Sequence, residues 1–123
     1  HIARATLEGI ALQVRELLTA MKADLGQSLT PLKVDGGAAA NNLLMQIQAD
    51  FLKIPVVRSQ VIETTALGAA LQAGLGVGIW EGLDEIDQKW KEEKRFVSRL
   101  SEKERKLKMS QWEKAVQAIK ALS

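Results

Sequence analysis

The sequence contains no cysteine. This excludes disulfide bonds, thiolate catalysis and cysteine-ligated zinc, and it fits a reducing compartment. An excess of one charge is also missing, because 17 Lys and Arg residues face 15 Asp and Glu residues and leave a net charge of +2. A chain so close to neutral lacks the basic surplus typical of nucleic-acid binding. We therefore expect no nucleic-acid partner.

A long hydrophobic run is absent as well. The most apolar stretch, Ala66 to Trp80, contains Gln72 and is shorter than the roughly 20 residues that cross a bilayer. The opening residues, His1 to Arg4, do not show the basic-then-apolar layout of a signal peptide. These observations predict no membrane span and a cytoplasmic location.

The chain does contain alternating helical and strand patterns. Residues 2–25 repeat apolar side chains at steps of three and four, which predicts an amphipathic helix. Gly26 follows as a C-terminal residue that can adopt a positive φ. Short strands are predicted at 32–34 and 55–58, with a helix at 41–53 between them.

A third helix, from about Thr64 to Leu75, consists almost entirely of small residues, so another element can approach its backbone closely. We expect Thr64 and Thr65 to cap it. A short helix is predicted at 83–86 and a last amphipathic helix around 109–119. The order helix, strand, helix, strand, helix predicts an α/β fold with parallel strands, followed by C-terminal helices. Two parallel strands do not form a stable sheet alone, so we expect further strands upstream in a larger protein.

Two adjacent glycines, Gly36 and Gly37, separate the first strand from the next helix. Glycine lets the backbone approach a ligand, and the amides of a following helix point toward it. No lysine or hydroxyl residue stands where a Walker A phosphate loop needs one. Asn41 lies one helical turn after Gly37, and its amide suits a purine edge or a ribose. The alternative is a plain tight turn in which Asn41 or Asn42 caps the helix.

The stretch VDGGAAANNLLMQ, residues 34–46, resembles the adenosine motif of the FGGY family of sugar kinases, members of the actin, hexokinase and Hsp70 superfamily. Its paired asparagines and the following Met-Gln are most similar to the glycerol kinases of that family. Three further stretches also resemble the family. HIARATLE at 1–8 resembles a family signature, and ETTALGAA at 63–70 resembles the small-residue helix between the two domains. AGLGVGIW at 73–80 resembles the segment after that helix. The resemblance is specific up to about Trp80 and weak beyond it.

This resemblance implies part of an actin-like (ribonuclease H-like) ATPase domain. Residues 1–123 would be the C-terminal, ATP-facing part of the kinase, with a nucleotide-binding core at 1–80 and a charged helical tail at 81–123. The N-terminal substrate domain would lie outside the chain. The implied reaction is ATP- and Mg²⁺-dependent phosphorylation of glycerol to sn-glycerol 3-phosphate, by a homo-oligomer that binds ATP or ADP. The alternatives are another sugar or polyol kinase of the family, and a non-catalytic nucleotide-binding or assembly module.

The resemblance also assigns site residues by position. Gly37 and Asn41 would contact the nucleotide, Gly36 would let the backbone lie against adenosine, and Ala38 would leave room beside it. Close contact between the two domains would involve the small residues of the third helix, namely Ala66, Gly68 and Ala69. The resemblance implies no catalytic residue and no metal ligand in this segment. Mg²⁺ would be bound mainly by residues outside it, and the segment alone would be inactive.

Other conspicuous residues are given structural interpretations. Asp35, next to the turn, is expected to make a structural hydrogen bond. The three tryptophans are interpreted as core or interface anchors, and His1 as a residue without a functional role. The glycines at 74, 76 and 78 are interpreted as the end of a helix. A dinucleotide motif is disfavoured because it would open a helix.

A basic segment precedes the last helix. Residues 91–108 hold eight Lys or Arg residues against four Glu residues. We interpret this surplus as a solvated helix face, and the alternative is a site for an anionic partner.

Overall fold

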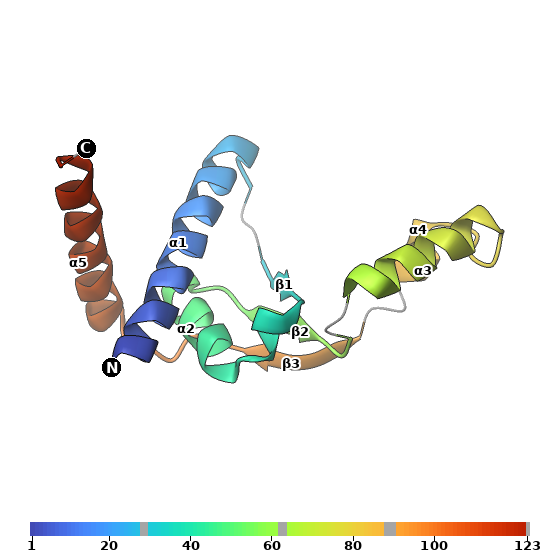
Figure 1. Cartoon of the computed structure of the whole chain (residues 1–123), viewed down its shortest axis with the longest axis horizontal. Coiled ribbons are helices and arrows are strands. Elements are labelled where there is room, and N and C mark those ends of the chain that lie inside the picture. Colours follow the sequence, from blue (N-terminus) through green and yellow to red (C-terminus); the bar gives the residue numbers. More distant parts are fainter. Residues whose placement is uncertain (28–29, 62–63, 88–90, 123) are drawn as a thin grey trace.

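The computed structural model describes residues 1–27, 30–61, 64–87 and 91–122. Every helix and strand predicted from the sequence is present at or near its expected place, which confirms the α/β class. Figure 1 shows the elements in chain order: α1 (Ile2–Leu25), β1 (Leu32–Val34), the 3₁₀ helix η1 (Gly37–Ala40), α2 (Asn42–Leu52), β2 (Val56–Ser59), α3 (Thr64–Gly76), α4 (Leu83–Asp87), β3 (Glu92–Phe96) and α5 (Glu102–Lys120). Gly26 ends α1 with a φ of 63°, as predicted.

The sheet has three strands in the order β1-β2-β3. β1 and β2 are parallel, with Leu32 opposite Val56, and this pairing was predicted. β3 runs antiparallel to β2, with Phe96 opposite Val56. The expectations of a purely parallel sheet and of an entirely helical tail after residue 80 are therefore wrong. The physical reason lies in β2, which is buried along its whole length and needs backbone partners on both sides.

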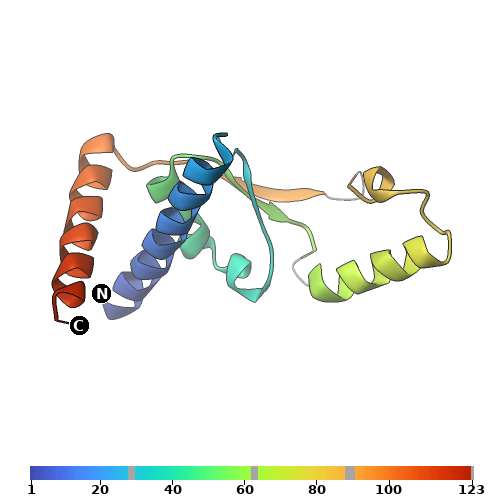
Figure 2. The same cartoon turned by 90° about the horizontal axis from the view of Figure 1, so that it is seen from above.

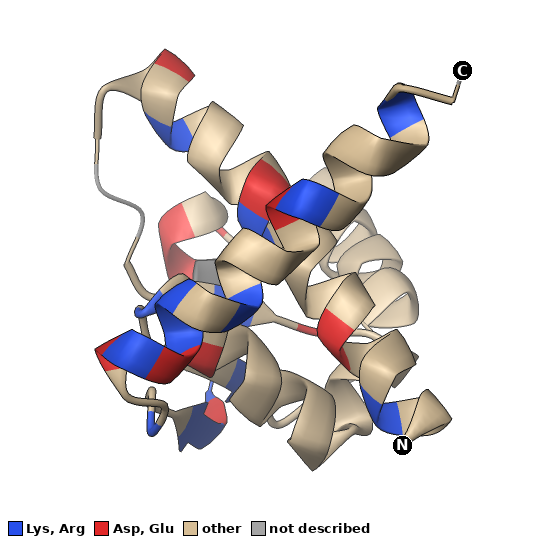
Figure 3. Ribbon diagram, turned by 90° about the vertical axis from the view of Figure 1, so that its left-hand side faces the viewer, with Lys and Arg blue, Asp and Glu red and all other residues tan. Residues whose placement is uncertain are grey.

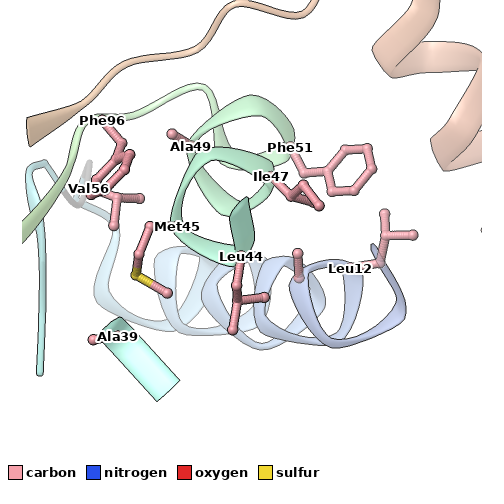
Figure 4. Packing of buried hydrophobic residues seen from close by; sticks show 10 residues of the cluster. Leu12, Ala39, Leu44, Met45, Ile47, Ala49, Phe51, Val56 and Phe96 are labelled. Carbon is pink, nitrogen blue, oxygen red and sulfur yellow. The ribbon is translucent and has the colours of Figure 1, made fainter. Parts of the chain in front are cut away.

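The hydrophobic core lies around α2. Figure 4 shows side chains of α2 packed between α1 on one side and the strands β2 and β3 on the other. The apolar residues of α2 recur at helical spacing, which places most of them on the faces that meet these neighbours. The core cluster consists of Ala11, Leu12, Ala39, Leu44, Met45, Ile47, Ala49, Phe51, Val56 and Phe96.

α5 packs beside α1, as both views of the molecule show (Figures 1 and 2). The indole nitrogen of Trp112 donates a hydrogen bond to Glu16 at 2.8 Å, so Trp112 anchors the two helices as predicted. Lys108 binds the carboxylate of Glu8 at 2.9 Å. Partial burial raises the pKa of Glu8, but hydrogen bonds from Lys108 and Arg4 outweigh it and hold the pKa below its usual value.

Some of the basic residues of 91–108 form ion pairs within the chain. Figure 3 shows basic and acidic residues close together along α5. Arg95 binds Glu92, and Arg105 binds Glu102, which also binds Lys53. Three of the eight basic residues of this segment, Arg95, Arg105 and Lys108, therefore face carboxylates of the same chain.

α3 and α4 project together from one end of the sheet, away from α1 and α5 (Figures 1 and 2). Thr64 and Thr65 are the first two residues of α3, and neither side chain makes a capping hydrogen bond within the described residues, in contrast to the prediction. Across the ranges that the structure describes, no helix combines the length and the apolar character needed to cross a membrane.

Candidate functional site

The turn between β1 and α2 depends on one glycine for its backbone conformation. Gly36 has a φ of 81° and a ψ of 169°, a region that residues with a side chain rarely adopt. Gly37 does not have a positive φ and begins η1. The two glycines therefore have different roles, and only Gly36 is required by the course of the chain.

Gly37 leaves a bare surface. A Cβ atom added there would meet no atom within 4 Å, and Gly37 and Ala38 are both exposed. Packing within the described residues therefore does not require a glycine at position 37. A bare, exposed backbone next to a helix start is the arrangement that lets a flat ligand lie against the chain.

Asn41 has a structural role and one free group. Its Oδ1 atom accepts a hydrogen bond from the backbone N–H of Leu44 at 3.0 Å, so Asn41 caps α2. Its side-chain NH₂ group has no hydrogen-bond partner among the residues that the structure describes, and the residue is exposed. The cap and a ligand contact are therefore compatible, because they use different atoms of the same amide.

Arg58 forms hydrogen bonds to the end of the turn, and the sequence analysis did not identify this residue. Its Nη1 donates to the carbonyl oxygens of Ala39 at 2.8 Å and Ala40 at 3.2 Å, and to Oδ1 of Asn42 at 3.0 Å. Its Nε and Nη2 donate to the two carboxylate oxygens of Glu93 on β3, at 2.6 and 3.2 Å. The available signal was an arginine within the short strand VVRS, because a buried charge requires partners.

The electrostatics of this network favour the ionised form of Glu93. Arg58 is 7% exposed, and its guanidinium also lies 5.5 Å from the ring centre of Phe96. The hydrogen bond from Arg58 lowers the pKa of Glu93 below its usual value despite the opposing effect of desolvation. Glu93 is therefore ionised at neutral pH and forms a bidentate ion pair with Arg58.

The remaining predicted residues lie apart from this network. Asp35 is exposed and makes no side-chain hydrogen bond within the described part of the chain, so the expected structural bond is not seen there. A Cβ atom added to Gly68 of α3 would meet no atom within 4 Å, so its contact with another domain stays a prediction. Ala66 and Ala69 of the same helix are exposed. Trp90 lies outside the described residues. No three acidic or histidine side chains gather into a possible metal site in the ranges that the structure covers.

Residues 1–77 match the C-terminal domain of the FGGY family of carbohydrate kinases. Two curated relatives are glycerol kinases. The one from Deinococcus radiodurans is 56% identical over 116 residues, and the one from Clavibacter michiganensis is 57% identical over 116 residues. Each alignment covers 94% of this chain and 23% of the relative. The chain thus spans less than a quarter of the length of these relatives.

Two solved structures are similar to this chain. The glycerol kinase of Plasmodium falciparum, described as a crystal structure with ADP, superposes with a TM-score of 0.80 at 40% identity, over 96% of this chain and 24% of that one. A xylulose kinase from Rhodospirillum rubrum superposes with a TM-score of 0.77 over 99% of this chain and 25% of that one. The second pair shares 22% of its residues, so that likeness concerns the fold alone.

Proposed function

Because this chain belongs to the FGGY family of carbohydrate kinases, we propose that it forms the ATP-facing part of a kinase that phosphorylates glycerol to sn-glycerol 3-phosphate. The observation that carries this proposal is the bare turn at Gly36 and Gly37, followed by the free amide NH₂ of Asn41. Two relatives named glycerol kinase, and the ADP in the Plasmodium falciparum structure, support both the nucleotide and the substrate.

In this proposal the adenosine of ATP or ADP lies against the backbone at Gly36 and Gly37. Ala38 is exposed and its small side chain leaves room beside the ligand. The NH₂ group of Asn41 donates a hydrogen bond to an acceptor on the purine or the ribose, while its Oδ1 stays bound to the N–H of Leu44. The turn thus orients the nucleotide and does no chemistry itself.

Phosphoryl transfer requires more than the proposed nucleotide turn. It depends on positioning and on stabilising the charge of the transferred group, usually with Mg²⁺. The described residues contain no cluster able to hold a metal ion. In keeping with the family resemblance, we assign the Mg²⁺ ligands, the glycerol site and the group that activates the hydroxyl to the rest of a kinase as long as its relatives. The homo-oligomeric state and the cytoplasmic location stay predictions.

The proposal is tested in the full-length protein that carries this chain, by replacing Gly37 with valine. The branched side chain would occupy the space proposed for adenosine, and we expect the Kd for ADP to rise by at least about tenfold while the Kd for glycerol stays unchanged. Both affinities are measured by calorimetric titration. Gly82→Val is the matched control, because a Cβ there also meets no atom within 4 Å. If Gly37→Val binds ADP like the wild type, the nucleotide does not lie on this turn.

A second test concerns the segment by itself. We expect the 123-residue chain to show no glycerol-dependent ADP release in a coupled assay with ATP and Mg²⁺. Turnover at rates typical of kinases, about 1–100 per second, would show that the catalytic groups lie within the chain.

A further inference from the structure

We propose that Arg58 is a positioning residue for nucleotide binding, and that Glu93 orients its guanidinium. This inference rests on the proposed function, since it concerns the same turn. Arg58 lies on β2 and Glu93 on β3, so neither belongs to the turn that faces the nucleotide. Their contribution to binding would be made through the backbone of η1 and the side chain of Asn42.

The contacts of Arg58 are concentrated at the end of η1. The carbonyl groups of Ala39 and Ala40 close this 3₁₀ helix, and the last carbonyls of any helix lack partners within it. Nη1 of Arg58 binds both, at 2.8 and 3.2 Å. The positive guanidinium also complements the partial negative charge at a helix C-terminus. Arg58 thereby fixes the orientation of the peptide groups that directly precede Asn41.

The two adjacent asparagines make different contacts. Asn42 turns its Oδ1 toward Arg58, at 3.0 Å, whereas Asn41 caps α2 and keeps its NH₂ group free on the surface. Arg58 therefore holds Asn42, which follows Asn41, as well as Ala40, which precedes it. The position of the Asn41 amide relative to the bare surface at Gly37 depends on these contacts.

Glu93 supplies the counter-charge that this arrangement needs. A buried guanidinium bonded only to neutral carbonyl groups would be costly, and a bidentate carboxylate offsets that cost while it fixes the plane of the guanidinium. The side chain of Glu93 is 44% exposed, so it extends from solvent to the buried arginine. The antiparallel strand that carries Glu93 therefore contributes to the geometry of the turn.

The experiment uses the full-length protein with two conservative substitutions, Arg58→Lys and Glu93→Gln. A lysine keeps the charge, but its single ammonium cannot reproduce the fork that reaches both the turn and the carboxylate. Glutamine keeps the size of Glu93 and removes its charge. We expect each variant to raise the Kd for ADP by about threefold to tenfold and to leave the Kd for glycerol within twofold of the wild type. The double variant should lose less ADP-binding free energy than the two single variants lose together, because both residues act through one network.

Arg95 and Glu92 provide matched controls. They form an ion pair of their own on β3 whose side chains are 45% and 36% exposed. Arg95→Lys and Glu92→Gln make the same chemical changes on β3, the strand of Glu93, without reaching the turn, so their Kd for ADP should stay within twofold of the wild type. Thermal unfolding of all five variants separates a loss of stability from a loss of affinity.

The possible outcomes are distinct. If Arg58→Lys and Glu93→Gln bind ADP like the wild type, or if they weaken ADP and glycerol binding equally, the positioning role is refuted. If Arg58→Lys does not fold, Glu93→Gln alone decides by the same criterion. If the wild-type protein does not bind ADP at all, the proposed function fails, and this inference fails with it.

Discussion

The indole of Trp80 covers Gly74 so closely that a Cβ atom on Gly74 would lie 2.4 Å from Nε1 and 2.8 Å from Cδ1 of Trp80. Gly74 is buried within α3, and its carbonyl oxygen accepts a hydrogen bond from the N–H of Ile79 at 2.8 Å. The segment after α3 thus folds back onto the end of the helix. The absence of a side chain at position 74 permits this contact, and only Gly78, with a φ of 77°, supplies the turn expected of the three glycines.

This contact predicts opposite effects for two glycines of the same helix. Gly74→Ala should lower the free energy of unfolding by about 1–3 kcal/mol, because the new methyl group collides with a ring. Gly68→Ala should be neutral or raise it by up to about 1 kcal/mol, because the space there is open and alanine favours helix. Denaturant unfolding of both variants checks the pair. Equal stabilisation by both would show that Trp80 does not pack on Gly74.

The two roles of Asn41 can be separated by substitution. Asn41→Asp keeps an oxygen that caps α2 and removes the NH₂ donor, so stability should stay close to the wild type while the KM for ATP rises about two- to tenfold. Asn41→Ala removes the cap as well and should also cost about 0.5–2 kcal/mol of stability. Thermal unfolding and steady-state kinetics of the full-length protein measure the two effects. An unchanged KM in both variants would leave Asn41 with the cap alone.

Asp50 of α2 holds the segment that leads into α5. Its Oδ1 accepts hydrogen bonds from the backbone N–H of Arg99 at 2.6 Å and from that of Leu100 at 3.3 Å. Asp50→Ala removes the acceptor of two N–H groups that are exposed or part-buried, and it should destabilise the protein by about 0.5–1.5 kcal/mol. Asp50→Asn retains an acceptor oxygen and should cost less. Hydrogen exchange of the α5 amides should be faster in Asp50→Ala than in Asp50→Asn, and equal rates would argue against this anchor.

Glu102 makes the start of α5 sensitive to acid. Hydrogen bonds from Arg105 and then from Lys53 lower the pKa of Glu102 from 4.5 to about 2. Because the pKa is lower in the folded state, the stabilising contribution is complete above pH 4.5 and is lost as the pH falls toward 2.

The pH dependence of the unfolding free energy should therefore be less steep between pH 4.5 and 2 in Glu102→Gln than in the wild type. Glu113→Gln is the control, because it removes one carboxylate from an exposed position on the same helix without touching the contacts of Glu102. Identical slopes for the wild type and Glu102→Gln would mean that these hydrogen bonds do not form in solution.

Local signals account for the elements that the sequence predicted. Gly26 ends α1 because it tolerates a positive φ, and Pro55 directly precedes β2 because proline suits the start of a strand. The turn at Gly36 and the cap at Asn41 likewise depend on neighbours within a few residues. Each of these features can be inferred from a short window of sequence.

Distant pairings account for what the sequence did not predict. β3 has the sequence EEKRF, in which four of five residues are charged and disfavour a strand assignment, and it forms because β2 has a free edge beside it. The Arg58–Glu93 pair joins residues 35 positions apart, so the sequence around either residue does not indicate its partner. A single sequence therefore predicted the turn without the network that supports it.

The charged composition of β3 has a consequence for how the sheet can grow. β3 forms one border of the described sheet and β1 the other. Charged side chains on an outer strand discourage another strand from joining it, whereas β1, with the sequence LKV, carries a single charge. We therefore expect any further strand of a longer protein to pair with β1 and not with β3, which the C-terminal segment supplies.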